Sequence, residues 1–233
     1  MIYMLDTADL KEIERLMDLY PIEGVTTNPT IVARGNLKLR ELIKRVRNLI
    51  GEEKMLHVQT ISDRSEDMVN EALRLRDLAG GNFYVKIPAT PQGIKAIQAL
   101  KKRNIKVTAT AIFTQLQGLI AAKAGADFIA PYVNRLDNIS SNGIEVVSDL
   151  VKLMDIYRLD TKVLAASFKN VDQVYRVGMG GAHAVTISPE LFDHIMHHPL
   201  IEQSVEAFKK DAVGFYDLDI KGHEEDRKRM KTA

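Results

Sequence analysis

The chain contains no cysteine among its 233 residues. This absence excludes disulfide bonds, thiolate metal sites and cysteine nucleophiles, and it fits a protein of the reducing cytoplasm. The formal net charge is only +1, so the overall charge indicates neither a nucleic-acid nor a membrane partner. No apolar run approaches the ~20 residues that a helix needs to span a bilayer. Composition therefore favours a cytoplasmic protein that binds neither nucleic acid nor membrane.

Signals for processing and for cofactors are also missing. Residues 1–6 have no basic region ahead of their apolar stretch, so we expect a first strand there rather than a signal peptide. Neither a P-loop nor a Gly-rich dinucleotide loop occurs, and the first expected strand is followed by Thr-Ala-Asp at residues 7–9. His194, His197 and His198 are more typical of a solvated helix end than of a zinc site. The sequence thus predicts neither a metal nor a cofactor.

Short apolar runs alternate with amphipathic stretches along most of the chain, and this pattern predicts eight strands that are each followed by a helix. The expected strands are Ile2–Asp6, Gly24–Thr27, Met55–Thr60, Asn82–Ile87, Lys106–Ala111, Phe128–Val133, Val163–Phe168 and Ala184–Ile187. The expected helices are Ala8–Tyr20, Leu37–Ile50, Glu66–Ala79, Gln92–Asn104, Gln115–Ala124, Ile144–Tyr157, Val171–Met179 and Pro189–His197. Thr7 and Ser65 are expected to cap the first and third of these helices.

Strand–helix alternation implies parallel strands that are covered by helices, and eight such units favour a single closed (β/α)8 barrel. Hydrophobic residues make up 45% of the chain, enough for a sizeable core. An open doubly wound sheet is the alternative, but its usual Gly-rich loop is absent. Residues 1–216 are therefore expected to form the barrel together with one extra helix, Ile201–Tyr216, and residues 217–233 a charged tail. We expect the extra helix to dock on a neighbouring subunit and the tail to be solvated.

Lys86 is the most unusual residue, because it lies inside an apolar run that is expected to be a buried strand. Burial makes the charged form of a lysine costly and lowers its pKa. A neutral amine is a nucleophile that can form a Schiff base with a ketone or aldehyde. The alternative is a structural lysine that pairs with Asp6 across the barrel.

Polar residues also occur at the C-terminal ends of seven successive expected strands, where barrels of this kind place their functional groups. The candidates are Asp6, Thr26, Asn28, Gln59, Lys86, Thr110, Tyr132, Arg135 and Ser167. A carboxylate, an amide, a hydroxyl and a phenol around an amine could hold a water and move protons, and an arginine could bind a phosphate. Simpler interpretations are a salt bridge between Arg135 and Asp137, and core packing of Tyr132 with its hydroxyl on a backbone carbonyl.

These residue types together predict a Schiff-base aldolase, because an iminium accepts electrons from a neighbouring carbon–carbon bond as it forms or breaks. A lysine in a barrel is also found in pyridoxal-phosphate enzymes, but the chain has no Gly-rich phosphate cradle. A barrel that binds sugar phosphates without chemistry is a further alternative, from a different class of function.

Five strings carry a resemblance to a known family. They are Leu5-Asp6-Thr7, Gly24-Val25-Thr26-Thr27-Asn28-Pro29-Thr30, Val85-Lys86-Ile87-Pro88, Ala130-Pro131-Tyr132-Val133-Asn134-Arg135 and Ala165-Ala166-Ser167-Phe168-Lys169. In these strings and their order, residues 1–216 resemble the small transaldolase family, in the subfamily of fructose-6-phosphate aldolase.

The resemblance implies a (β/α)8 barrel without metal or cofactor, in which Lys86 forms a Schiff base with a sugar-phosphate substrate. It implies that Asp6 takes part in proton transfer, with Gln59, Thr110 and Tyr132 around a bound water. It further implies that Asn28 contacts the donor hydroxyls, and that Arg135 and Ser167 hold a phosphate. Members of the family form pentamers or decamers through the C-terminal helix, so a homo-oligomer is expected here.

Two positions distinguish activities within the family. True transaldolases typically carry glutamate where this chain has Gln59, and phenylalanine where it has Tyr132. Both residues of this chain follow the aldolase pattern. The sequence therefore predicts reversible cleavage of fructose 6-phosphate into dihydroxyacetone and glyceraldehyde 3-phosphate, with transfer of a dihydroxyacetone unit between sugar phosphates as the alternative.

Overall fold

The computed structural model describes residues 1–35, 37–213 and 215–216, and the chain divides into two compact units, residues 1–193 and 194–233. The charged tail expected over residues 217–233 lies outside the described residues. The first unit contains the barrel and is described by itself.

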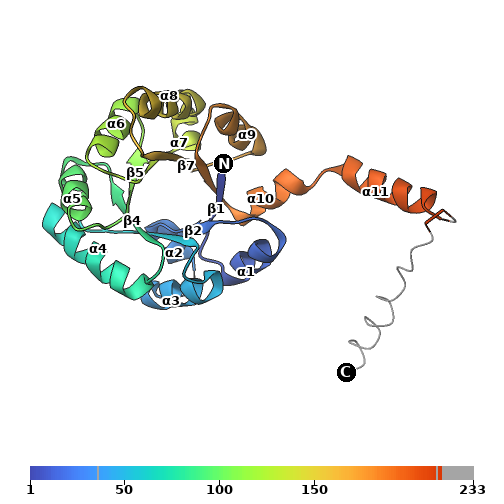
Figure 1. Cartoon of the computed structure of the whole chain (residues 1–233), viewed down its shortest axis with the longest axis horizontal. Coiled ribbons are helices and arrows are strands. Elements are labelled where there is room, and N and C mark those ends of the chain that lie inside the picture. The colour runs from blue at the N-terminus through green and yellow to red at the C-terminus, as the bar shows by residue number, and fades with distance from the viewer. Residues whose placement is uncertain (36, 214, 217–233) are drawn as a thin grey trace. The chain divides into compact units, whose positions relative to one another are not determined.

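Eight parallel strands form a closed barrel in chain order, which confirms the predicted fold (Figure 1). Each strand pairs with the next, and β8 closes on β1 through the register Leu5↔Ile187. The strands are β1 (Ile2–Asp6), β2 (Gly24–Thr26), β3 (Met55–Gln59), β4 (Phe83–Pro88), β5 (Val107–Ile112), β6 (Phe128–Pro131), β7 (Lys162–Ala165) and β8 (Ala184–Ile187). Because all the strands run the same way, their C-terminal ends meet at one mouth of the barrel.

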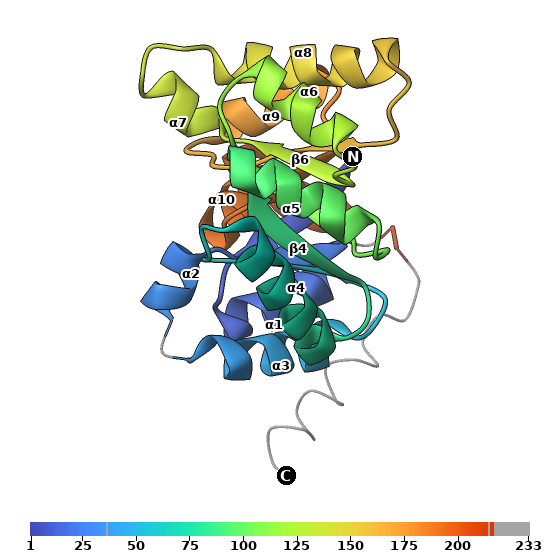
Figure 2. The same cartoon turned by 90° about the vertical axis from the view of Figure 1, so that its left-hand side faces the viewer.

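Helices surround the strands, as Figures 1 and 2 show. Those of the barrel are α1 (Leu10–Leu19), α2 (Pro29–Arg34), α3 (Leu39–Ile50), α4 (Ser65–Ala79), α5 (Pro91–Lys101), α6 (Gln115–Lys123), α7 (Val133–Asp137), α8 (Gly143–Ile156), α9 (Val171–Met179) and α10 (Pro189–Met196). The predicted bounds of α9 agree with the structure, and most other ends differ by one to three residues. Each long helix turns an apolar stripe towards the strands, as Ile13 and Leu16 of α1 illustrate.

Two short helices, α2 and α7, were missed by the periodicity of the sequence. Each has six residues or fewer, which is too short for a repeat of 3.6 residues to become visible. Asn28 and Pro29 did carry the signal of a helix start, since the Asn28 side chain accepts from Ile31 N and proline stands at the first helical position. Strand β6 accordingly ends at Pro131, and Val133 belongs to α7. Both helices follow strands directly and lie at one end of the barrel (Figure 2).

Two predicted helix caps were wrong. Helix α1 is capped by Asp9, whose carboxylate accepts from Lys11 N and Glu12 N, while the Thr7 hydroxyl accepts from Asp9 N. Helix α4 begins at Ser65 itself, and Arg64 occupies the cap position without a side-chain hydrogen bond. At α1 the fold uses Asp9, which is a stronger capping residue than Thr7, whereas at α4 it starts the helix one residue ahead of the expected position and leaves Ser65 inside the first turn.

Side chains alternate between the inside and the outside of each strand. The successive inward-pointing side chains of the strands therefore form two layers in the barrel interior. The layer near the N-terminal ends is an apolar cluster of Met4, Met55, Phe128, Leu164 and Ala184. The layer near the C-terminal ends contains buried polar side chains, among them Thr26, Lys86 and Thr110. The site is therefore built on rigid strands above a packed floor.

In the second unit, helix α11 (Pro199–Asp211) forms part of the segment in which an extra helix was expected. It starts two residues earlier than predicted, because His198 caps it and Pro199 occupies its first turn. The part of the chain that the structure describes contains no helix of the length and hydropathy that crossing a bilayer requires.

Candidate active site

Lys86 lies near the end of β4 and is only 5% exposed. In the sheet register it stands opposite Gln59 of β3 on one side and Thr108 of β5 on the other. Its ammonium nitrogen donates to the carbonyl oxygen of Thr27 at 2.7 Å. Burial lowers the pKa of Lys86, and the nearby carboxyl of Asp6 offsets part of that effect. The side chain is thus an amine that gives up its proton more readily than an ordinary lysine.

The alternative of a structural ion pair between Lys86 and Asp6 is not what the structure shows. Among the described residues, Lys86 bonds to a backbone carbonyl, and no salt bridge joins it to Asp6. The two groups interact at longer range, since each influences the pKa of the other. The amine and the carboxyl are therefore farther apart than the distance of an ion pair.

Asp6 ends β1 and takes part in a chain of hydroxyl groups. Thr26 donates from its hydroxyl to the Asp6 carboxylate at 2.7 Å, and the Thr26 and Thr186 hydroxyl oxygens lie 2.7 Å apart. Although part of Asp6 borders a cavity, burial raises its pKa above the usual value, while Lys86 and the Thr26 hydrogen bond act against that shift. A carboxyl with a raised pKa can hold and release a proton closer to neutral pH.

Tyr132 and Thr110 lie side by side, with the phenol oxygen 2.9 Å from the Thr110 hydroxyl oxygen. This contact answers one alternative, because the Tyr132 hydroxyl bonds to a side chain rather than to a backbone carbonyl. The Tyr132 ring makes an edge contact with Phe113 at a centroid distance of 5.6 Å. The hydroxyl pair is therefore held in place by packing as well as by hydrogen bonding.

Arg135 lies on α7 with its guanidinium carbon 4.9 Å from the centre of the Tyr132 ring. Asp137 does not pair with it. The Asp137 carboxylate accepts instead from Gly143 N at 2.9 Å and from the Gln173 amide at 2.6 Å. Arg135 thus lies on an aromatic face, and among the described residues no carboxylate pairs with its guanidinium.

The backbone is strained on both sides of the end of β6. Ala111 has φ 58° at an irregularity in the pairing of β5 with β6, and Ser167 has φ 62° after β7. Neither residue is a glycine, so each conformation costs free energy that the surrounding fold must supply. The Ser167 carbonyl oxygen accepts from Asn134 N at 2.7 Å, next to Arg135. Strain of this kind gathers at functional sites, where it directs side chains.

Three further candidates lie at the same mouth. Thr26 is fully buried in the Asp6 hydroxyl chain, while Asn28 and Gln59 keep some exposure. The side-chain oxygen Oδ1 of Asn28 caps α2 by accepting from Ile31 N at 3.0 Å, which leaves the side-chain nitrogen Nδ2 as a possible donor. The Gln59 carbonyl oxygen is buried and has no partner among the described residues.

The sequence analysis missed one buried titratable residue, His57 of β3. It lies two positions before Gln59, so strand alternation places both on the inner face. Its Nδ1 is 2.8 Å from the Thr108 hydroxyl oxygen, and its ring stacks on Tyr84 at a centroid distance of 4.5 Å. Burial, followed by the nearby Lys86, lowers the pKa of His57 well below its usual value, so the ring is neutral. The signal in the sequence that could have indicated His57 was a histidine inside an apolar strand.

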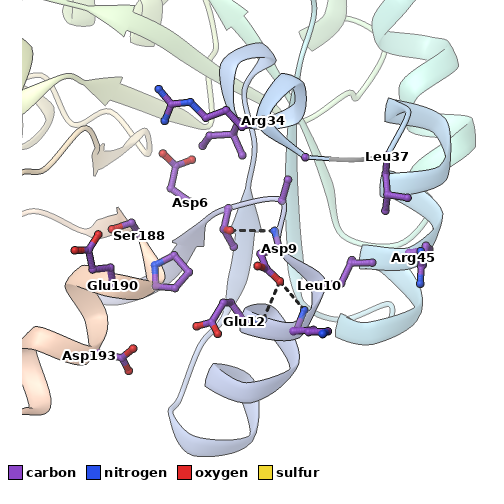
Figure 3. A pocket seen from close by; sticks show the side chains of 16 residues that line it. Asp6, Asp9, Leu10, Glu12, Arg34, Leu37, Arg45, Ser188, Glu190 and Asp193 are labelled. Atoms are coloured by element: carbon purple, nitrogen blue, oxygen red, sulfur yellow. Dashed lines mark hydrogen bonds between the residues drawn. The ribbon is translucent and has the colours of Figure 1, made fainter.

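Cavities flank the cluster. One of about 900 Å³ runs from Asp6 past the N-terminus of α1 to Arg34, Ser188 and Glu190. Figure 3 shows Asp6 and Arg34 on one side of it and Glu190 on another. A second cavity of about 530 Å³ is lined by Gln59 and Thr60, among others. Within the described ranges, no three His, Asp or Glu side chains are grouped so that they could hold a metal ion.

Comparison with known proteins identifies the family of the chain. Residues 3–231 match the model of the family described as transaldolase/fructose-6-phosphate aldolase. The chain is 44% identical over 210 residues to a protein of Streptococcus pneumoniae (strain ATCC 700669 / Spain 23F-1) named "Probable fructose-6-phosphate aldolase". That similarity covers 90% of this chain and 95% of the relative.

Solved structures with the same fold are more distant. A soluble mutant of (S)-mandelate dehydrogenase from Pseudomonas putida superposes with a TM-score of 0.58, and a mutant mandelate oxidase with 0.55. Both are 13% identical and match 81% of this chain, which spans 66% and 64% of their lengths, so the likeness concerns the fold alone. On the family match and the streptococcal relative together, the chain belongs to the transaldolase/fructose-6-phosphate aldolase family.

Proposed function

We propose that this protein is a class I aldolase that reversibly cleaves fructose 6-phosphate into dihydroxyacetone and glyceraldehyde 3-phosphate. The observation that carries the proposal is Lys86, a buried amine with a lowered pKa at the mouth of the barrel. Among class I enzymes such an amine forms the Schiff base with the donor ketone. The name of the streptococcal relative supports the substrate.

The proposed reaction begins when the Lys86 amine attacks the ketone carbon and water leaves, which gives a protonated iminium. A base removes the proton of the C4 hydroxyl, the C3–C4 bond breaks, and its electron pair moves into the iminium to give an enamine. Glyceraldehyde 3-phosphate departs as the aldehyde. The enamine carbon then takes up a proton, and water hydrolyses the resulting iminium to release dihydroxyacetone and free Lys86.

We assign the proton transfers to the groups around Lys86. Asp6, with its raised pKa, exchanges a proton during iminium formation and hydrolysis. The Tyr132–Thr110 pair and Gln59 hold the water through which protons pass to and from the reacting carbons. The 2.9 Å contact between the two hydroxyl groups supports this assignment, because it orients the phenol.

Substrate contacts are assigned to groups further out at the mouth. Thr26 and the free amide nitrogen of Asn28 bind hydroxyl groups of the donor. Arg135, whose guanidinium lies over Tyr132, and Ser167 bind the phosphate of the acceptor. The position of Arg135 and Ser167 relative to the Lys86 amine then selects a ketose whose phosphate lies at the end away from the ketone.

The experiment that tests the proposal is borohydride reduction in the presence of dihydroxyacetone. Reduction converts a Schiff base into a stable amine, so we expect a mass adduct on the peptide that contains Lys86. Lys86→Met serves as the control and should give no adduct. If dihydroxyacetone binds but no adduct forms on the wild-type protein, the chain is a sugar-phosphate-binding barrel without this chemistry.

The second candidate is a transaldolase, which the family includes. Gln59 and Tyr132 favour the aldolase, because a phenol that holds the water can protonate the enamine and release the ketone. An assay with fructose 6-phosphate and no acceptor separates the two, since an aldolase turns over and a transaldolase stops after one cleavage. Gln59→Glu with Tyr132→Phe should move the balance towards transfer. Unchanged cleavage in this double variant would contradict the role given to the pair.

We also propose that the protein is a cytoplasmic homo-oligomer, a pentamer or decamer that uses its C-terminal helix. Helix α11 exposes Leu200, Ile201, Val205 and Phe208, which recur at helical spacing and form an apolar stripe. Such a stripe is typical of a face that another protein surface covers. Sedimentation of the wild type against a Phe208→Glu variant tests this, and an unchanged oligomeric state would contradict it.

A further inference from the structure

Two buried polar atoms on β3 have no hydrogen-bond partner among the described residues. They are Nε2 of His57 and the carbonyl oxygen Oε1 of Gln59. His57 is fully buried, so its nitrogen has no access to solvent. An unsatisfied buried polar atom costs about 1–3 kcal/mol, and native proteins rarely tolerate two in one place.

The two side chains lie two positions apart on β3, so a third group can lie between them. Residues two apart in a strand point the same way, with backbones about 6.6 Å apart. One water that makes two hydrogen bonds of about 2.8 Å spans up to about 5.6 Å, which fits side chains on that spacing. The position of the His57 ring is fixed, since the ring stacks on Tyr84 and makes an edge contact with Phe128 at a centroid distance of 5.4 Å.

The contact made by Nδ1 of His57 determines which of the two ring nitrogens carries the proton. When the Thr108 hydroxyl donates to Nδ1, across their 2.8 Å contact, Nε2 of the neutral ring must carry the hydrogen. Nε2 is then a donor, and Oε1 of Gln59 is an acceptor. A single water between them accepts from one and donates to the other, so both atoms are satisfied in one consistent network.

We propose that His57 is a positioning residue, which holds the Gln59 amide through a buried water bridging His57 Nε2 and Gln59 Oε1. The bridge holds Oε1 of Gln59 so that it points into the barrel. The amide nitrogen of Gln59 is thereby turned towards the mouth, as a donor to the reacting groups. This role rests on the proposed aldolase function, whereas the bridging water itself does not.

The first test is a high-resolution crystal structure of the wild-type protein. We expect one ordered water within hydrogen-bonding distance of both His57 Nε2 and Gln59 Oε1, and no such water in His57→Phe. A direct bond between the two side chains, or no water between them, would overturn the proposal. This result does not depend on whether the protein is an aldolase.

The second test is a double-mutant cycle on kcat for fructose 6-phosphate cleavage. His57→Phe should lower kcat by about tenfold, below the roughly hundredfold that a 1 Å misplacement of a catalytic group can cost. If His57 acts through Gln59, the same change should have almost no effect on kcat in a Gln59→Leu background. Equal losses in the two backgrounds would overturn the proposal, since a purely structural role does not depend on Gln59.

Two further variants serve as controls for the cycle. His57→Gln keeps a donor near the position of Nε2 and should restore most of kcat. His183→Phe removes a histidine whose Nδ1 accepts from Val163 N outside the mouth cluster, and it should leave kcat unchanged. Failure of His57→Gln to restore kcat, where its crystal structure retains the water, would contradict the positioning role. Absence of any Lys86 adduct, with the water present, would instead contradict the aldolase function.

Discussion

The two ends of the barrel interior are built from the same strands but follow opposite rules. Strand β4 presents Tyr84 to the apolar layer and Lys86 to the polar layer, and the chain through β6 presents Phe128 below and Tyr132 above. The lower layer satisfies ordinary burial, since Met4, Phe128 and Leu164 exclude water from one another. The upper layer buries an amine, a carboxyl and several hydroxyl groups.

The difference shows where the fold gains stability and where it gives stability up. Burial raises the pKa of Asp6 and lowers that of Lys86, and both shifts mean that the charged forms are disfavoured in the folded protein. The apolar layer must offset this cost. Changes in the upper layer should therefore alter activity without loss of stability, and changes in the lower layer should do the reverse.

The largest effect is expected from Lys86→Met. It removes the nucleophile, so activity should fall at least about a thousandfold, as when other covalent nucleophiles are removed. It also removes a buried amine, so the free energy of unfolding should rise by roughly 0.5–2 kcal/mol. Steady-state kinetics and chemical denaturation check the two outcomes. A loss of stability would contradict the contrast between the layers.

The opposite result is expected from Leu164→Ala in the apolar layer. Leu164 is only 1% exposed, and its truncation should lower the free energy of unfolding by about 2–5 kcal/mol. At a temperature where the variant stays folded, kcat should remain within about twofold of the wild type, since Leu164 lies in the apolar layer rather than among the groups assigned to the reaction. A collapse of kcat in a folded variant would show that the layers are not separable.

A smaller effect concerns pH and the lowered pKa of Lys86. The unfolded chain holds the lysine proton up to a pH near 10.5, while the folded protein releases it earlier. Between those two pKa values the unfolded state binds more protons, so the stability of the wild type rises with pH. The advantage of Lys86→Met should shrink as pH rises through this window, and denaturation at several pH values measures it. A constant advantage would mean that the pKa of Lys86 is not lowered.

The smallest effect is expected from Thr90→Ala. Thr90 follows β4 at the same end of the barrel as the candidate site, but its hydroxyl caps α5 by accepting from Gly93 N at 3.0 Å. Its removal should cost about 1 kcal/mol of stability, as for other caps, and leave kcat unchanged. A drop in kcat would mean that polar residues at this end cannot be divided into caps and site residues by their hydrogen bonds.

The sequence predicted the barrel because periodicity and strand–helix alternation are local properties. It also indicated Lys86, since a charged residue within an apolar strand conflicts with its surroundings. It did not reveal α2 and α7, which are too short to show a period, and it chose Thr7 and Ser65 as caps where the fold uses other residues. His57 was missed because a single histidine gives no local sign of what faces it.

The amino-acid sequence by itself determined the number and order of the strands and of the long helices, the end of the barrel at which polar groups gather, and the family strings. Tertiary structure alone decided the pairings, because they join residues far apart in the chain. Lys86 bonds to the Thr27 carbonyl rather than to Asp6, Tyr132 bonds to Thr110, and Arg135 lies over a ring instead of pairing with Asp137. The physical reason is that closure of the barrel, which no local pattern contains, fixes which side chains meet in its interior.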